Sequence, residues 1–253
     1  MNIAFLGNGS RGEVCKQALL EAGHSLVDNI NECELIVMAG YNRILPKDVF
    51  SRPKYGAINC HAGRLPKYRG SSVLNWAIIN GETVGSANII QVDEGIDTGD
   101  VLFERGFLIR DRDTIATVRE TVNKIFAELL PEVVYKISIG AVSPIPQGGG
   151  EYWHHRQPAD SRIIWGEMTA KQVYDLVRAS EYPYCAWTDF VWKVYGITNN
   201  YAYADVPRAR LLTSSYHGIP GRVVGKVDDG VIVIAADRGI WIDAELSVGS
   251  QLY

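Results

Sequence analysis

Long hydrophobic segments are absent from this sequence of 253 residues. No apolar run approaches the roughly 20 residues that a helix needs to cross a bilayer, so the sequence argues against a helical membrane protein. The apolar start, residues 1–6, carries neither a basic region nor a cleavage site. We therefore expect a first β-strand there and not a signal peptide.

Cysteine is scarce as well. The four cysteines are far apart, and no pair has the spacing of a zinc site or of a redox motif; they are Cys15, Cys33, Cys60 and Cys185. We expect free thiols in a reducing compartment, and hence a cytoplasmic protein. The same spacing predicts no bound metal.

Basic residues do not outnumber acidic ones. Lys and Arg total 25 and Asp and Glu total 29, which gives a formal net charge of −4. This balance argues against a protein that holds nucleic acid through broad positive charge, although it leaves room for a small basic site in a cleft. Hydrophobic residues make up 47% of the chain and charged residues 21%, which is typical of a globular protein.

Segments with strand and helix patterns alternate through the first 140 residues. Strands are predicted at 2–6, 25–27, 34–39, 57–59, 86–92 and 101–109, and helices at 13–22, 71–80 and 114–139, the last with an interruption left open at Pro131. The alternation predicts an α/β fold with a doubly wound, mostly parallel, Rossmann-like sheet.

Proline and glycine cluster in residues 143–150, which end in three glycines and form the best boundary candidate. We predict a main domain at 1–150, a linker with a helix packed on that domain at 151–190, and a small β-rich domain at 191–253. Within the last part, two alternating segments flank Asp228-Asp229-Gly230, which is a hairpin signal.

Three glycines follow the first predicted strand. Gly7, Gly9 and Gly12 form Gly-x-Gly-x-x-Gly at the start of a helix, and Asp28 follows later. This pattern is close to the dinucleotide fingerprint, but the second strand is short and Asp28 does not stand clearly at its end, so we expect no NAD or NADP. A substrate phosphate at the helix start and a purely structural turn stay equally open.

Asn59 and His61 are two residues apart at a strand end, so their side chains share a face. An amide and an imidazole together can stabilise the oxyanion that forms when a carbonyl is attacked. An acidic loop between two later strands can bring Asp97 beside His61, where a carboxylate favours the imidazolium and can relay a proton. The simpler interpretations are that His61 is a structural histidine whose hydrogen bonds are satisfied and that the acidic loop is merely solvated. The spacing of the acidic residues does not match a calcium-binding EF-hand.

Three segments resemble the folate-dependent formyltransferases, a family that includes enzymes acting on methionyl-tRNA, glycinamide ribonucleotide and nucleotide sugars. They are Asn59-Cys60-His61, Leu65-Pro66-Lys67-Tyr68-Arg69-Gly70 and residues 93–99. Residues 39–45, 80–83 and 156–165 are also similar. The resemblance extends from residue 1 to about 190 and continues weakly to the end.

The resemblance implies formyl transfer from 10-formyltetrahydrofolate to an amine, without metal or NAD. It implies that Asn59, His61 and Asp97 form the catalytic triad. The folate-binding residues that it implies are Tyr41, Arg43, Ile44, Leu45, Gly63, Arg64, Leu65, Pro66, Asp93 and Gly95. The acceptor contacts that we expect with it are Gly9, Ser10, Arg11, Lys67, Tyr68 and Arg69.

The sequence departs from the family at two places. Gly63-Arg64 stands where the family usually has Ser-Leu, and the connection from Val27 to Glu34 is shorter than usual. We therefore expect the sheet to be shortened near residues 27–34.

The short tail and the acidic charge favour a nucleotide-linked aminosugar as the acceptor, with methionyl-tRNA as the alternative and a non-catalytic binding protein behind both. Trp153, Tyr182, Tyr184 and Trp187 are candidates to stack a base, or are core residues. The expected partners are small molecules, the folate and the aminosugar. We expect no membrane partner and no nucleic acid unless tRNA is the acceptor. The possibility of a homodimer is left open.

Overall fold

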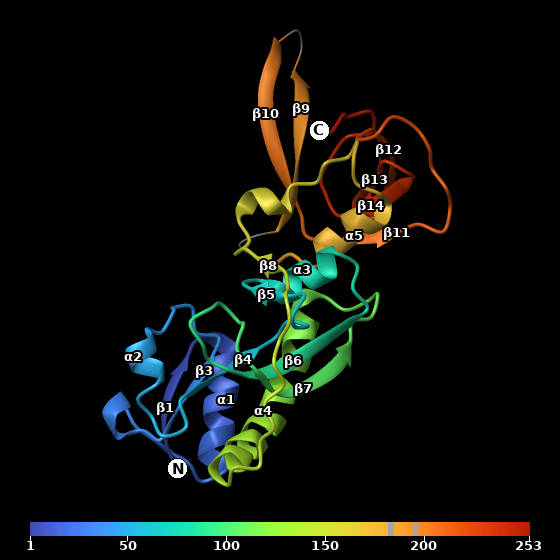
Figure 1. Cartoon of the computed structure of the whole chain (residues 1–253). Helices are drawn as coiled ribbons and strands as arrows, with labels where there is room; N and C mark the ends of the chain where they lie inside the picture. The colour runs from blue at the N-terminus through green and yellow to red at the C-terminus, as the bar shows by residue number, and fades with distance from the viewer. Residues whose placement is uncertain (182–184, 195–196) are drawn as a thin grey trace. The chain divides into compact units, whose positions relative to one another are not determined.

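The computed structural model describes residues 1–181, 185–194 and 197–253 (Figure 1). The chain divides into two compact units. The first comprises Met1–Leu74, Thr83–Asp111 and Thr117–His155, and the second comprises Asn75–Glu82, Arg112–Ala116 and Arg156–Tyr253. The predicted divisions near residues 150 and 190 stay predictions. In the described part of the chain, no helix combines the length and the apolar character that a membrane span requires.

The first unit is built on a six-stranded sheet of order β2-β1-β3-β4-β6-β7 (Figure 1). Its strands are β1 (Asn2–Gly7), β2 (Ser25–Leu26), β3 (Leu35–Ala39), β4 (Ala57–His61), β6 (Val84–Gln91) and β7 (Val101–Leu108). The pairs among β2, β1, β3 and β4 are parallel, whereas β6 and β7 join antiparallel. The predicted fold class, a mostly parallel α/β sheet, is confirmed.

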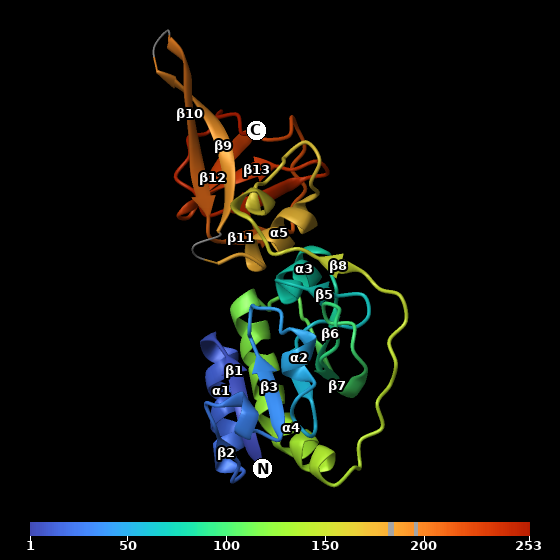
Figure 2. The same ribbon diagram turned by 60° about the vertical axis from the view of Figure 1, so that its left-hand side comes forward.

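Two helices cover the same face of this sheet, α1 (Gly9–Glu21) and α4 (Ile115–Ser138) (Figure 1 and Figure 2). Asn123 of α4 donates to Ser10 Oγ of α1 at 3.1 Å, and the Arg11 guanidinium lies over the Phe126 ring. On the other face, Phe50 of α2 (Lys47–Phe50) packs in a core cluster with Ala4, Ile36, Met38 and Ala57.

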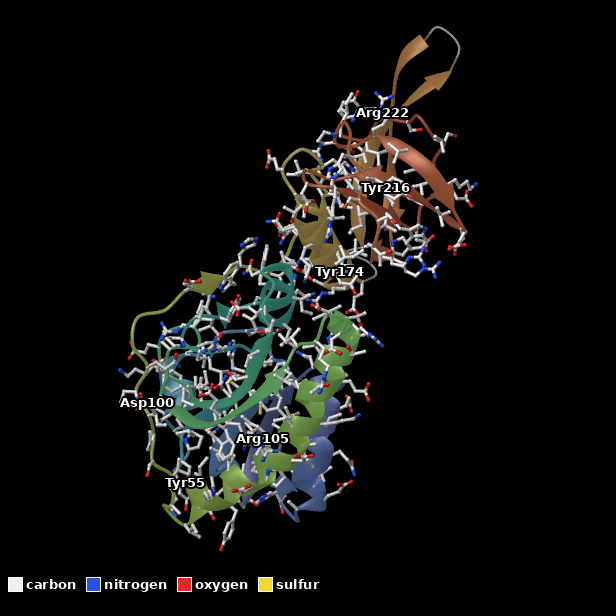
Figure 3. All side chains as sticks on the ribbon, turned by 90° about the vertical axis from the view of Figure 1, so that its right-hand side faces the viewer. Tyr55, Asp100, Arg105, Tyr174, Tyr216 and Arg222 are labelled. Carbon is white, nitrogen blue, oxygen red and sulfur yellow. The ribbon has the colours of Figure 1, made fainter. Side chains whose placement is uncertain are left out.

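Helix α4 runs continuously through Pro131. A proline inside a helix removes one backbone hydrogen bond and disfavours the helix by about 3 kcal/mol. The neighbouring apolar face compensates, since Phe126, Leu129, Leu130 and Val133 are all buried. Arg105 of β7, which is labelled in Figure 3, pairs with Glu128 on the exposed side of α4 at 2.8 Å.

The connection from β2 to β3 contains only a single 3-10 turn, η1 (Ile30–Glu32), as the short Val27–Glu34 segment predicts. Asn29 caps this turn by accepting from the backbone N–H of Asn31 at 3.0 Å. The chain therefore passes from the edge strand β2 to the interior strand β3 with no α-helix between them. All five residues of β3 are buried, which suits an interior parallel strand.

The remaining elements of the first unit are short: β5 (Arg69–Gly70) pairs in parallel with β8 (Tyr152–Trp153). Helix α3 (Val73–Ile79) leads from the first unit into the second. The β5–β8 pair places Gly70 beside the loop that carries Asp97.

The second unit contains an antiparallel sheet of order β11-β14-β13-β12, with a separate β9–β10 hairpin. Its elements are η2 (Pro158–Ser161), α5 (Ala170–Arg178), β9 (Ala186–Val194), β10 (Ile197–Val206), β11 (Ala209–Leu211), β12 (Val223–Val227), β13 (Gly230–Ile234) and β14 (Gly239–Ile242). The Asp-Gly hairpin is confirmed as β12–β13, and Asp228 adopts a φ of 54° in its turn. Trp165 lies in the core of this unit.

Candidate active site

Two side chains and one backbone N–H contact the Asp97 carboxylate. Asn59 Nδ2 donates to Asp97 Oδ1 at 3.1 Å, and His61 Nδ1 lies 3.3 Å from Asp97 Oδ2. The backbone N–H of Gly70 donates to the same Oδ2 at 2.9 Å. The structure thus brings together the three residues that the sequence predicts as a triad.

The positions of these residues follow from the sheet. Asn59 and His61 alternate along β4, so both side chains leave the strand on one face, while Cys60 between them faces the other way. Asp97 lies in the loop that joins β6 to β7, beside the carboxyl end of β4. In the antiparallel register, His61 is opposite Asn88 of β6.

Both nitrogens of the His61 ring have acceptors as neighbours. The ring is 5% exposed, its Nδ1 faces the Asp97 carboxylate, and its Nε2 lies 2.7 Å from the Tyr68 carbonyl oxygen. A neutral imidazole has only one N–H to donate, whereas the protonated ring donates from both nitrogens. The ring is thereby held at both of its nitrogens, between the Asp97 carboxylate and the Tyr68 carbonyl.

Gly63 explains one departure from the family pattern. A Cβ added at this position would overlap the Tyr68 carbonyl oxygen and would lie 2.6 Å from His61 Nε2. The absence of a side chain is what lets the Tyr68 carbonyl reach His61. Asn88 secures the same turn by donating from Nδ2 to the Gly63 carbonyl at 2.6 Å.

The Asp97 loop, residues 93–99, is internally bonded. Asp93 accepts from the Gly95 N–H at 3.0 Å and from Thr98 Oγ1 at 2.7 Å. Asp97 itself has a φ of 54°, in the left-handed region that favours glycine. The acidic loop is therefore a fixed scaffold for one carboxylate and not a loosely solvated segment.

The residues predicted to bind folate fall into two groups. Arg43, Arg64 and Ile44 are exposed, with Ile44 at 73%. Tyr41 and Leu45 are half-buried against the core cluster that contains Phe50, and Gly63, Leu65, Pro66, Asp93 and Gly95 belong to the segments just described. Lys47 pairs with Glu94, which ties α2 to the Asp97 loop.

The residues predicted to contact the acceptor differ in their exposure and in their contacts. Gly9 and Ser10 are exposed at the start of α1, while burial lowers the pKa of Arg11, whose guanidinium lies 5.5 Å from the centre of the Phe126 ring. Lys67 is exposed, and Arg69 is half-buried with its guanidinium on Gln147.

The aromatic candidates are engaged in packing. Tyr68 is 0% exposed and stacks on Trp153 with ring centroids 5.4 Å apart, so its ring is enclosed by packing. Trp153 Nε1 donates to the Lys67 carbonyl at 3.0 Å, and Trp187 Nε1 donates to the Pro158 carbonyl at 2.9 Å. Tyr182 and Tyr184 lie outside the described residues.

Cys60 is not a nucleophile candidate despite its place between Asn59 and His61. A hydrogen bond with Cys15 and burial raise the pKa of the Cys60 thiol well above its ordinary value. The thiolate, which is the reactive form, is thereby disfavoured. Within the described ranges, no three His, Cys, Asp or Glu side chains gather as a metal site.

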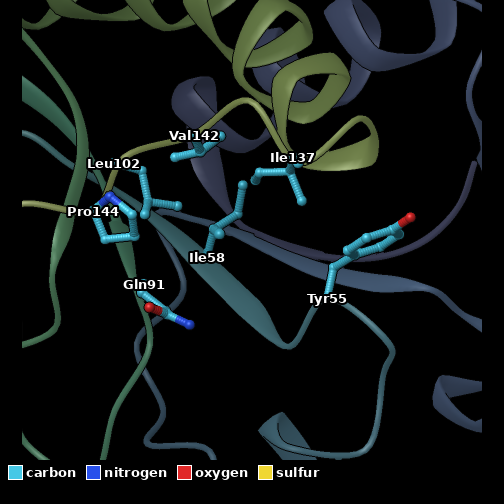
Figure 4. Close-up of a pocket in the computed structure, with 8 residues that line it drawn as sticks. Tyr55, Ile58, Gln91, Leu102, Ile137, Val142 and Pro144 are labelled. Carbon is cyan, nitrogen blue, oxygen red and sulfur yellow. The ribbon is translucent and has the colours of Figure 1, made fainter.

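A separate pocket of about 160 Å³ lies near the end of α4 (Figure 4). Its lining is mainly apolar and consists of Tyr55, Ile58, Gln91, Leu102, Ile137, Gly140, Val142 and Pro144. Ile58 leaves β4 on the face opposite to Asn59, so the pocket is on the other side of the strand from the Asp97 cluster. Its volume is below the roughly 300 Å³ at which typical ligand pockets begin.

Sequence reasoning missed two residues, Asn88 and Gln147. Asn88 is a polar residue within a buried strand, where an apolar residue would be expected, and this is a usable signal. Gln147 lies 50 residues beyond Asp97, in the Pro- and Gly-rich segment that the sequence marks only as a boundary. A polar side chain enclosed by prolines and glycines is the weak signal that was available for it.

Comparison with known proteins gives consistent matches. The sequence matches the formyl transferase family over residues 3–134 and the formyl transferase C-terminal domain over residues 156–249. It is 38% identical to the methionyl-tRNA formyltransferase of Thermodesulfovibrio yellowstonii over 157 residues, which is 61% of this chain and 50% of that protein. It is 31% identical to the methionyl-tRNA formyltransferase of Clostridium novyi over 84% of this chain and 66% of that protein. The chain thus spans about half to two thirds of the length of these curated relatives.

Solved structures share the fold. A sugar 3N-formyl transferase superposes with a TM-score of 0.73 at 15% identity, covering 98% of this chain and 99% of that one. The methionyl-tRNA formyltransferase of Clostridium thermocellum gives 0.61 at 23% identity, covering 81% and 99%.

The expected nucleotide-aminosugar acceptor is wrong. The curated relatives at 31% to 38% identity are methionyl-tRNA formyltransferases. Two solved sugar formyltransferases are only 14% to 15% identical, and a solved formyltransferase bound to a formamido sugar nucleotide is 25% identical over 61% of this chain. The expectation relied on chain length and net charge, which are properties of the whole chain. Neither describes the surface around the reacting amine, and so neither can identify the acceptor.

Proposed function

We propose, because this chain belongs to the formyl transferase family, that it transfers a formyl group from 10-formyltetrahydrofolate to the amino group of methionyl-tRNA. The observation that carries the chemistry is the convergence of Asn59, His61 and the Gly70 N–H on the Asp97 carboxylate. The acceptor is supported by the methionyl-tRNA formyltransferases among the relatives. Free cysteines agree with a reducing, cytoplasmic location.

In the proposed reaction, the neutral amine attacks the formyl carbon of the folate and the formyl oxygen becomes an oxyanion. Asn59 uses one N–H on Asp97 and has a second for the oxyanion. His61 donates a hydrogen bond from its Nε2–H to the oxyanion when the formyl oxygen replaces the Tyr68 carbonyl as acceptor. Asp97 accepts a proton from the amine and returns it to N10. The bond from the formyl carbon to N10 then breaks as the oxyanion re-forms the carbonyl, and tetrahydrofolate leaves.

We expect the protein to bind 5-formyltetrahydrofolate, a stable isomer of the donor, and not to bind NAD or NADP. Packing and backbone conformation account for glycines of the first turn, because a Cβ at Gly12 would lie 2.8 Å from the Gly7 carbonyl carbon and Gly9 has a φ of 62°. Isothermal titration calorimetry with each ligand measures the difference. Saturable binding of NAD, with none of the folate, would contradict both parts of this expectation.

We expect formylation of methionyl-tRNA, with deacylated tRNA and the His61→Asn variant as matched negative controls. Mass spectrometry of the released aminoacyl group detects the added formyl group. Because tRNA binding releases counterions, raising the salt concentration should weaken use of the tRNA far more than binding of the folate. If the protein binds folate but leaves methionyl-tRNA unmodified at low salt, the proposed acceptor is incorrect.

A further inference from the structure

Gln147 joins two segments of the site through its side-chain amide. Its Nε2 donates to the Asp97 carbonyl at 3.1 Å and to the Gly99 carbonyl at 2.6 Å. Its Oε1 accepts from Arg69, with 3.0 Å to Nη2 and 3.3 Å to Nε. One half-buried side chain therefore uses both ends of its amide within the site.

Through its donating nitrogen, Nε2, Gln147 holds the backbone that carries the catalytic carboxylate. Asp97 has a φ of 54°, a left-handed conformation that disfavours a non-glycine residue. Such a conformation persists only where the surroundings fix it. The two carbonyl contacts bracket Thr98 and fix the turn from Asp97 to Gly99 on either side of it.

Through its accepting oxygen, Oε1, Gln147 is connected to the same carboxylate by a second set of contacts. Arg69 is the residue before Gly70, and the Gly70 N–H donates to Asp97 Oδ2. The Arg69 guanidinium also donates to the Gly148 carbonyl at 2.8 Å, so it is held at two adjacent residues. Contacts thus run in a closed ring from Asp97 through Gly70 and Arg69 to Gln147 and back to Asp97.

We propose that Gln147 is a positioning residue for formyl transfer, which fixes the Asp97 carboxylate against Asn59 and His61. This inference rests on the proposed function. An amide is required, because the two carbonyls need a donor while the guanidinium needs an acceptor. Glutamate has the same shape but offers acceptors at both ends, so it meets the carbonyls with repulsion.

The test compares Gln147→Glu and Gln147→Ala with Gln17→Ala, a control at an exposed glutamine on α1 that donates to Glu21. Each Gln147 variant should lower kcat by about tenfold, the equivalent of one hydrogen bond, and leave KM for the folate unchanged. In an Asp97→Asn background, the same substitutions should have almost no further effect, because Gln147 acts through that carboxylate. A merely structural role would instead lower the melting temperature and leave kcat in place.

A second readout does not need the reaction. Hydrogen exchange of the Gly70 amide, which bonds Asp97, should be faster in both Gln147 variants than in the wild type and in Gln17→Ala. If the wild type transfers no formyl group, the proposed function fails while this exchange measurement still decides the role of Gln147. Unchanged exchange at Gly70 overturns the inference, as does unchanged kcat in an active enzyme.

Discussion

Asp97→Asn should lower the turnover of formyl transfer by at least about 100-fold while the protein stays folded. Asparagine keeps an oxygen for the Gly70 N–H and tolerates the positive φ, so the loop retains its shape. It lacks the negative charge that faces His61 and cannot accept the amine proton. Steady-state kinetics gives the loss, and thermal unfolding shows that the fold is intact.

The partners of Asp97 should behave in the same way, so Asn59→Ala and His61→Asn should each lower turnover by at least about 100-fold. Asp228→Asn is the matched control, since Asp228 also has a φ of 54° but lies in the exposed β12–β13 turn. Its turnover should equal that of the wild type. Near-normal activity of Asn59→Ala, His61→Asn or Asp97→Asn would remove the affected residue from the mechanism.

Gly99→Ala should disable the site through the backbone. A Cβ at Gly99 would overlap the carbonyl oxygen of Gln91, and neither backbone segment is a flexible side-chain end that can turn away. The Asp97 loop must then shift, and a misplacement of about 1 Å at a reacting group can lower the rate by about 100-fold. We also expect a loss of about 1 to 3 kcal/mol in the free energy of unfolding, as for other overpacked positions.

Gly106→Ala, in β7 of the same hairpin, is the control for this substitution. A Cβ there has only the Gly85 carbonyl oxygen nearby, at an ordinary contact distance of 3.8 Å. Urea unfolding and turnover should both stay close to those of the wild type. Equal stability and turnover of the Gly99 and Gly106 variants would show that the close approach to Gln91 is not required.

The parts of the fold that the sequence predicted are those governed by local periodicity. The two-residue repeat of a strand sufficed to place Asn59 and His61 on one face, and the Asp-Gly pair sufficed for the β12–β13 hairpin. The predicted helix, residues 114–139, covers all of α4, although local rules could not settle that it continues through Pro131. Its buried face, a tertiary property, decides that point.

The parts that escaped prediction depend on contacts between distant segments. Gln147 reaches Asp97 across 50 residues, and nothing in its immediate sequence specifies that contact. Asn88 depends in the same way on a turn 25 residues earlier. The prediction of the acceptor was wrong for a different reason, because total charge and length carry no information about one local surface.

The left-handed backbone at position 97 has an evolutionary consequence. Glycine adopts this conformation freely but offers no acceptor to Asn59, His61 and the Gly70 N–H, whereas asparagine tolerates the conformation and keeps an oxygen for Gly70. Selection for the reaction retains the charge of the carboxylate, whereas selection for the fold requires only the backbone conformation and an acceptor. A lineage that no longer used the reaction would therefore be expected to drift toward asparagine at this position while keeping the fold.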